Sequence, residues 1–189
     1  AFKSAFINGF GIETDLRDFN QNIVISHDMP KEGCMTFSDF ISMASSNNNV
    51  TLALNIKSDG LQSTLGKLKL DSPHFYFDMS VPDMLHYCIN GSKFYTRYSD
   101  IETTPSLYFE SHGIWLDNFK DDTLNLEMLE HFLKDGKNVV LVSPELHKRN
   151  KSNYWKSLRH FLISNQEYVG KVGLCTDFPF KAREYFNEQ

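Results

Sequence analysis

Short apolar runs alternate along this chain with longer amphipathic stretches. The run at 139–142 is continuously apolar, as is typical of a strand that is buried on both faces. Runs of this kind, together with segments of period two, predict strands at 12–17, 23–26, 50–56, 75–79, 94–98, 114–116, 139–142 and 172–175. Stretches of helical period predict helices at 2–6, 61–70, 82–90, 124–134, 154–164 and 180–186, with a polar loop over 45–49.

Strands that alternate with helices are the pattern of a parallel sheet covered by helices, so the fold class is α/β. This pattern leaves two architectures open, a doubly wound sheet and a TIM (β/α)8-type barrel. Nearly every predicted strand ends in polar residues, which in a TIM barrel converge at the carboxyl face, where the active sites of that fold lie. About seven barrel strands are present. Because the chain opens within a helix at Ala1, we expect the first strand of a barrel to precede it.

Composition narrows the class of protein. The 189 residues are 41% hydrophobic and contain no linker-like segment, which predicts one domain over 1–189. The formal net charge of -5 argues against a nucleic-acid binder, and no apolar run approaches the roughly 20 residues of a membrane-spanning helix. Cys34, Cys88 and Cys175 form no CxxC pair, which fits a reducing, cytoplasmic location better than a disulfide framework or a zinc site. The oligomeric state is left open.

The first chemical signal is a pair of carboxylates on one predicted strand. Glu13 and Asp15 stand two positions apart, so both side chains point to the same face, where oxygen ligands could bind one divalent cation. A solvated strand edge or a capping pair is the alternative explanation. The next predicted strand supports the metal-site interpretation. It is apolar and places His27 at its end, before a proline turn.

In order and spacing, these residues resemble the glycerophosphodiester phosphodiesterase family, which belongs to the PI-phospholipase-C-like phosphodiesterases. The resemblance begins with Glu-x-Asp, a hairpin and a strand that ends in His-Asp. It continues through strands that end like the family's Glu-x-Lys, Phe-Asp and Thr-Asp-x-Pro motifs. The matching segments are Glu13-Thr14-Asp15, His27-Asp28, Asn55-Ile56-Lys57, Phe77-Asp78 and Thr176-Asp177-Phe178-Pro179.

The resemblance implies a TIM barrel and metal-dependent hydrolysis of a small, glycerophosphodiester-like phosphodiester. It implies that Glu13 and Asp15 bind a divalent metal, Mg²⁺ or Ca²⁺, with Asn55 at the third ligand position. It also implies that His27 is one of two acid/base histidines and that Lys57 holds the phosphate. A cation and an ammonium offset the charge that develops on the phosphodiester, and an imidazole can protonate the leaving alkoxide.

The sequence departs from the family pattern in two places. The family carries its first histidine in a His-Arg-Gly motif on strand one, and this sequence does not contain that motif. Asn55 offers a neutral amide oxygen where the family has a carboxylate, so we expect weaker metal binding. Both departures favour the alternative function, a non-catalytic barrel module that binds phosphate- or sugar-phosphate-containing ligands.

Three further residues are candidate substrate contacts. Arg97 follows a predicted strand and could bind a phosphate or a carboxylate, or instead form a salt bridge with Asp100 or Glu102. Asp117 ends another strand and is a second candidate.

Glu145 is the third candidate, on the loop after the strand at 139–142, where it could contact a substrate headgroup. We expect Trp115, on the strand that Asp117 ends, to be a packing residue. His147 lies on the same loop as Glu145 and could also contact a headgroup, but an exposed loop residue is the favoured interpretation.

Overall fold

The computed structural model describes residues 1–45 and 49–187. Positions 46–48 of the expected polar loop therefore lie outside the described residues, and Ser45 ends a helix. The chain divides into two compact units, Ala1–Tyr95 (unit 1) and Thr96–Gln189 (unit 2). In the part of the chain that the structure describes, no helix is both long enough and apolar enough to cross a bilayer.

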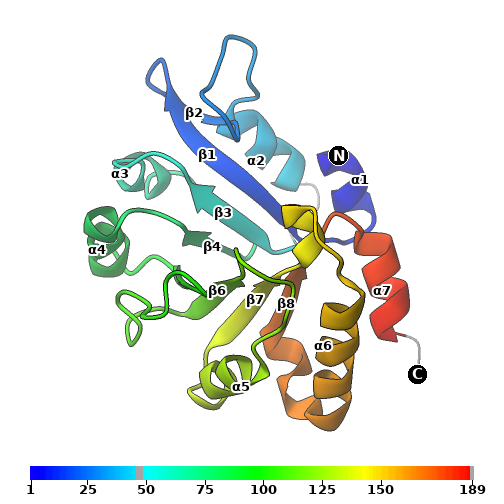
Figure 1. Cartoon of the computed structure of the whole chain (residues 1–189). Coiled ribbons are helices and arrows are strands. Elements are labelled where there is room, and N and C mark those ends of the chain that lie inside the picture. Colours follow the sequence, from blue (N-terminus) through cyan, green and yellow to red (C-terminus); the bar gives the residue numbers. More distant parts are fainter. Residues whose placement is uncertain (46–48, 188–189) are drawn as a thin grey trace. The chain divides into compact units, whose positions relative to one another are not determined.

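Unit 1 is built on a four-stranded sheet with the order β2-β1-β3-β4 (Figure 1). Its strands are β1 (Ile12–Phe19), β2 (Asn22–Ile25), β3 (Leu52–Ile56) and β4 (His74–Phe77). Strands β1, β3 and β4 run parallel, whereas β2 pairs antiparallel with β1 as a hairpin. The carboxyl ends of β1, β3 and β4 therefore lie at one edge of this sheet.

Strand β1 follows directly from the alternation in its sequence. Ile12, Thr14 and Leu16 are buried, while Glu13 and Asp15 between them are only partly buried on the other face. The hairpin to β2 turns at Asn20 and Gln21, which both have positive φ, 47° and 63°. Positive φ at both central residues is the conformation of a type I′ turn, whose twist suits a two-residue hairpin.

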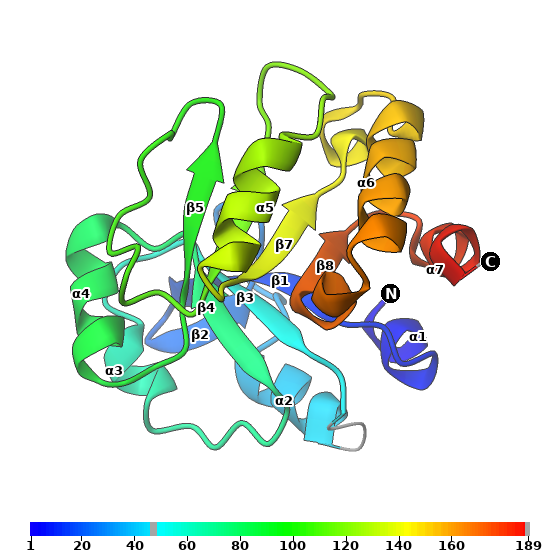
Figure 2. The ribbon, with the colours of Figure 1, turned by 90° about the horizontal axis from the view of Figure 1, so that it is seen from below.

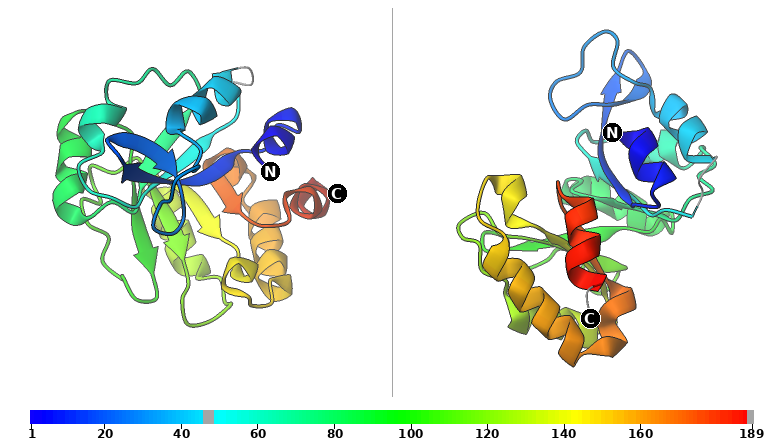
Figure 3. Two further views of the ribbon diagram at one scale, coloured as in Figure 1. Left: turned by 90° about the horizontal axis from the view of Figure 1, so that it is seen from above. Right: turned by 90° about the vertical axis from the view of Figure 1, so that its right-hand side faces the viewer.

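Aromatic side chains pack the first two helices of unit 1 together. Helices α1 (Phe2–Ile7) and α2 (Phe37–Ser45) meet through Phe40, whose ring centroid lies 5.0 Å from that of Phe2 and 5.8 Å from that of Phe6. The right-hand view of Figure 3 shows α1 and α2 side by side. Helix α2 begins after Thr36, whose hydroxyl accepts from the backbone N–H of Asp39 at 3.1 Å and so caps the helix. Helices α3 (Gln62–Leu65) and α4 (Val81–Ile89) complete the unit.

Unit 2 contains the second four-stranded sheet, with the order β5-β6-β7-β8. Its strands are β5 (Tyr95–Ser99), β6 (Gly113–Asp117), β7 (Asn138–Val142) and β8 (Val172–Cys175), of which β6, β7 and β8 run parallel. Helix α5 (Leu126–Lys134) lies beside β7 (Figure 2). Helix α6 (Ser152–Ser164) packs on α7 (Pro179–Asn187) through Trp155, and two 3₁₀ helices, η1 (Pro144–His147) and η2 (Gln166–Lys171), follow β7 and α6.

The α/β class with parallel strands is confirmed, and all eight predicted strands are present in the described residues. Hydrogen bonding arranges them in two four-stranded sheets; closure into one barrel and the single domain stay predictions. The helix predicted at 61–70 is shorter than expected, since α3 ends at Leu65, where Gly66 follows and glycine is a poor helix former. Helix α2 is missing from the predicted pattern, although Phe37, Phe40 and Ala44 have helical spacing and are buried.

Candidate functional site

Strand register brings together the predicted metal ligands and Lys57. On the parallel strands β1 and β3, Glu13 pairs with Ala53 and Asp15 pairs with Asn55, so Glu13, Asp15 and Asn55 lie on one face of the sheet. Lys57 follows directly after β3, and its Nζ lies 3.4 Å from Asp15 Oδ1. Both side chains are largely buried, with 28% of Lys57 and 15% of Asp15 exposed. The arrangement places two carboxylates of β1 beside an amide and an ammonium at the carboxyl end of β3.

Glu13 is costly to ionise in this cluster, mainly because it is buried and secondly because it lies near Asp15. Burial and the neighbouring carboxylate of Asp15 raise the pKa of Glu13 to about 7, with a smaller contribution from Asp78. A hydrogen bond from Asn55 and the charge of Lys57 oppose this rise but do not cancel it. A bound cation would lower the cost of ionising Glu13 in this place.

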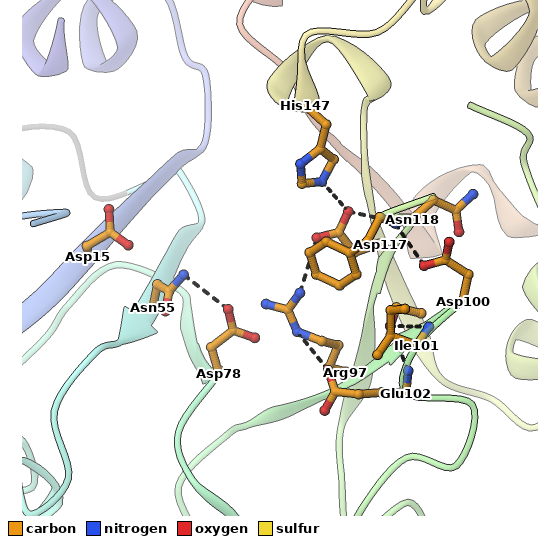
Figure 4. Close-up of polar contacts among 12 residues, drawn as sticks. Asp15, Asn55, Asp78, Arg97, Asp100, Ile101, Glu102, Asp117, Asn118 and His147 are labelled. Carbon is orange, nitrogen blue, oxygen red and sulfur yellow. Dashed lines mark hydrogen bonds and ion pairs between the residues drawn. The ribbon is translucent and has the colours of Figure 1, made fainter. Parts of the chain in front are cut away.

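Asn55 also favours a bound cation, because only the nitrogen of its side-chain amide has a hydrogen-bond partner. The residue is 6% exposed, and its Nδ2 donates to Asp78 Oδ2 at 3.2 Å, as Figure 4 shows. Its Oδ1 is buried without a hydrogen-bond partner, which is costly unless a donor or a cation approaches it. Two carboxylates and an unpartnered amide oxygen fit the oxygen-ligand preference of Mg²⁺ and Ca²⁺. Within residues 1–45 and 49–187, no group of three or more His, Cys, Asp or Glu side chains is arranged to hold a metal ion.

His27 lies beyond the end of β2 and is open to solvent. Its side chain is 79% exposed, and its Nδ1 donates to Asp28 Oδ1 at 2.9 Å. That hydrogen bond and the charge of the imidazole hold the pKa of Asp28 below its ordinary value. The backbone of His27 is fixed more firmly than its side chain, because its carbonyl accepts from Arg17 Nε at 3.2 Å and from Arg17 Nη2 at 3.1 Å.

Unit 2 carries its own polar cluster at the ends of β5, β6 and β7. Arg97 Nη1 donates to Asp117 Oδ2 at 3.1 Å, and His147 Nε2 donates to Asp117 Oδ1 at 2.7 Å (Figure 4). Only 6% of the Asp117 side chain is exposed, so both of its oxygens depend on these partners and on the backbone N–H of Asn118. Arg97 Nε also lies 3.5 Å from Glu102 Oε2.

The alternative for Arg97, a salt bridge with Asp100 or Glu102, is present with Glu102. The carboxylate of Asp100 accepts from the backbone N–H groups of Phe119 and Lys120. The roles of Arg97 and Asp117 as substrate contacts stay predictions. Trp115 is 5% exposed, as a packing residue should be.

Glu145 is held inside unit 2 by two hydroxyl groups. Ser143 Oγ donates to Glu145 Oε2, and Thr176 Oγ1 donates to Glu145 Oε1. Ser143 in turn accepts from the indole N–H of Trp155 at 2.7 Å. The carboxylate therefore ties the turn after β7 to the segment after β8, and its contact with a substrate headgroup stays a prediction.

Asp78 and His147 belong to these clusters although neither was among the predicted site residues. Asp78 directly follows β4, has a positive φ of 65°, a conformation that non-glycine residues rarely adopt, and accepts from Asn55. His147 was expected to be exposed, but its side chain is only 29% exposed and bonds to Asp117. The signal for Asp78 was its position directly after a parallel strand, and that for His147 was its place in the segment after β7 that also carries Glu145.

Comparison with known proteins gives a match by structure only. No family model and no curated protein sequence matches this chain. A candidate glycerophosphodiester phosphodiesterase from Galdieria sulphuraria superposes with a TM-score of 0.66 at 15% identity, covering 95% of this chain and 85% of that one. The chain has the fold of these phosphodiesterases. A glycerophosphodiester phosphodiesterase from Parabacteroides distasonis agrees, with a TM-score of 0.61 at 14% identity over 97% of this chain and 87% of that one.

The structural match confirms the resemblance in fold that the strand-end motifs predicted. At 14% and 15% identity, the match shows a shared fold, and the chemistry has to be argued from the residues of the site. Of the unit 1 residues that carried the resemblance, Glu13, Asp15, Asn55, Lys57 and Asp78 form one cluster. His27 also carried it, but its side chain pairs with Asp28 and is 79% exposed.

Proposed function

We propose that this chain is a phosphodiester hydrolase that acts on glycerophosphodiester-like substrates with the help of a divalent cation. The observation that carries the proposal is the cluster of Glu13 and Asp15 on β1 with Asn55 and Lys57 at the carboxyl end of β3, in a fold shared with glycerophosphodiester phosphodiesterases. Carboxylates, a buried amide oxygen and an ammonium are the groups that phosphoryl chemistry requires.

The cation would be held by Glu13, Asp15 and the unpartnered Oδ1 of Asn55. When bound, Mg²⁺ or Ca²⁺ would supply positive charge to a non-bridging phosphate oxygen and so offset the charge that develops in the transition state. Because Asn55 is neutral, this donor set binds the cation more weakly than three carboxylates would.

Lys57 contributes the second positive charge. Its ammonium lies beside Asp15 and is only 28% exposed, so it is held close to the carboxylates in a partly desolvated position. There it can donate to another phosphate oxygen, and the low local polarity strengthens that interaction.

His27 is the proton-transfer group in this mechanism. An oxygen nucleophile, either water or a neighbouring hydroxyl of the substrate, forms a bond to phosphorus and releases its proton to solvent, and the bond from phosphorus to the departing alcohol breaks. The imidazolium of His27 gives its proton to that departing oxygen, so that a neutral alcohol leaves. The high exposure of the side chain, 79%, lets it reach a substrate without first breaking a buried contact.

The test is hydrolysis of a panel of phosphodiesters, including glycerophosphodiesters, with Mg²⁺ or Ca²⁺ and with EDTA. We expect turnover that EDTA abolishes and that His27→Ala and Lys57→Met each lower at least tenfold, while thermal unfolding is unchanged. His86→Ala is the matched control, because His86 is an exposed histidine of α4 in the same unit. Full activity in His27→Ala would remove the central residue of the proposal.

The second candidate function is a module that binds phosphate- or sugar-phosphate-containing ligands without turnover. The observation that favours it is Asn55, which leaves the cluster with fewer charged ligands than the family pattern has. Calorimetric titration with glycerol 3-phosphate distinguishes the two functions. Binding that depends on Lys57, with no turnover of any diester in the panel, would establish the module and exclude the hydrolase.

A further inference from the structure

Arg17 connects the two segments that carry His27 and Lys57. It lies on β1, two positions after Asp15 and on the same face, and its guanidinium reaches both flanking segments. Nε and Nη2 donate to the carbonyl of His27 at 3.2 and 3.1 Å, and Nη1 donates to the carbonyl of Lys57 at 3.3 Å. One side chain thus holds the backbone on both sides of β1.

These contacts lie where the backbone hydrogen bonds of the sheet end. The last backbone bonds from the flanking segments to β1 are Ser26 N–H to Asp15 O, 3.1 Å, and Lys57 N–H to Leu16 O, 3.0 Å. Beyond them, His27 is outside β2 and Lys57 is outside β3. The planar, forked guanidinium hydrogen-bonds the residue at or after the last backbone bond on each side of β1. A lysine ammonium cannot reproduce this geometry.

The side chains of His27 and Lys57 have few contacts of their own to fix them. Within the described residues, the side chain of His27 bonds to the exposed Asp28 and that of Lys57 pairs with Asp15. The bonds from Arg17 to the two carbonyls add a restraint on the backbone from which both side chains leave. Proton transfer depends steeply on geometry, and a displacement of about 1 Å can lower a rate by about 10²-fold.

We propose that Arg17 is a positioning residue that orients His27 and Lys57 together for phosphodiester hydrolysis. The proposal rests on the proposed function and assigns Arg17 no contact with the substrate. Because its action passes through His27, the loss in an Arg17 variant should depend on how much the leaving group needs a proton. An alkyl alcohol needs one, whereas 4-nitrophenolate leaves without it.

The experiment compares Arg17→Met and Arg17→Lys with the parent chain on two metal-supplemented substrates, glycerophosphoethanolamine and glycerol 4-nitrophenyl phosphate. For Arg17→Met we expect kcat to fall about 10- to 100-fold on the alkyl substrate and several-fold less on the nitrophenyl substrate, with KM changed less than about twofold. The kcat of Arg17→Lys should lie between those of the parent chain and Arg17→Met. Arg183→Met, an exposed arginine of α7, should leave the ratio of the two substrates unchanged.

Three outcomes would overturn the proposal. An equal loss on both substrates that follows the loss of folded protein would mean that Arg17 only stabilises the sheet. A higher KM with unchanged kcat would mean that it contacts the substrate. Parent-level kcat on both substrates would mean that the contacts to His27 and Lys57 are dispensable.

A second measurement does not depend on activity and separates this proposal from the proposed function. Amide hydrogen exchange at Ser26 and Lys57, whose N–H groups make the last hydrogen bonds to β1 beside the two held carbonyls, should be faster in Arg17→Met than in the parent chain. Faster exchange in Arg17→Met, together with a parent chain that hydrolyses no diester, would contradict the hydrolase while keeping the clamp. Unchanged exchange would contradict the clamp itself.

Discussion

Asp15 and Asn55 are direct register partners on the adjacent parallel strands β1 and β3. They are 40 positions apart in the sequence, which does not predict that they meet, yet the register puts their side chains next to each other on one face. The amide oxygen of Asn55 has no hydrogen-bond partner there, and Glu13 carries a raised pKa beside it. This relationship leads to the first two predictions.

Asn55→Asp should act in opposite directions on metal affinity and on the stability of the metal-free protein. A third carboxylate adds a charged ligand, so we expect Mg²⁺ or Ca²⁺ to bind at least tenfold more tightly in calorimetric titration. The same charge lies near Glu13, Asp15 and Asp78, so in EDTA the melting temperature should fall. Asn153→Asp, at an exposed position of α6, should change neither quantity appreciably. Equal metal affinity in Asn55→Asp and the parent chain would contradict a cation at this position.

The stability of the metal-free protein should fall as the pH rises from about 4.5 to 7. The pKa of Glu13 is raised in the folded state to about 7, so over this range the folded chain binds more protons than the unfolded chain. Stability gained from the protonated form is then lost as the group ionises, by up to about 3 kcal/mol for a shift of this size. Urea unfolding in EDTA at several pH values measures this slope.

Glu13→Gln should remove most of that slope, because glutamine does not ionise. Glu184→Gln, which makes the same change of charge at an exposed position of α7, is the control and should keep it. Addition of Mg²⁺ or Ca²⁺ should restore stability at pH 7 in the parent chain. A parent chain whose unfolding free energy does not change over this range would show that Glu13 is not buried among uncompensated carboxylates.

Asp117→Ala should destabilise unit 2 by about 3 to 5 kcal/mol, since it removes the buried carboxylate that pairs with both Arg97 and His147. Glu102→Gln breaks the other ion pair of Arg97, in which the Glu102 side chain is 57% exposed, and should cost less than about 1 kcal/mol. Chemical unfolding monitored by tryptophan fluorescence compares the two variants. Similar losses in both would show that burial of Asp117 does not determine the strength of this cluster.

Gln21→Gly should stabilise the β1–β2 hairpin. Gln21 has a φ of 63°, which costs a residue with a Cβ about 1 kcal/mol and costs glycine little. The substitution creates Asn-Gly, the preferred pair for a type I′ turn, and should raise the unfolding free energy by about that amount. Gln21→Ala keeps the Cβ and should give no gain. Equal stability of Gln21→Gly and Gln21→Ala would mean that the turn carries no such strain.

The sequence by itself determined the local elements and the residues at their ends. Alternation within 12–17 was enough to place Glu13 and Asp15 on one face of β1, and the continuous apolar run at 139–142 was enough to predict the buried strand β7. These patterns depend on neighbours within a few positions, so they are visible without tertiary structure. The end of α3 at Leu65 and the presence of α2 were the local features that the predicted pattern missed.

Only the tertiary structure decided which of these residues meet. The register of β1 against β3 joined Asp15 to Asn55, the fold of unit 2 brought His147 to Asp117, and the reach of one guanidinium linked Arg17 to His27 and Lys57. Each pair is separated by ten or more positions, and strand pairing over such separations is set by the packing of whole faces rather than by local preference. For that reason the residue types of the site could be read from the sequence, whereas their partners, burial and charge balance could not.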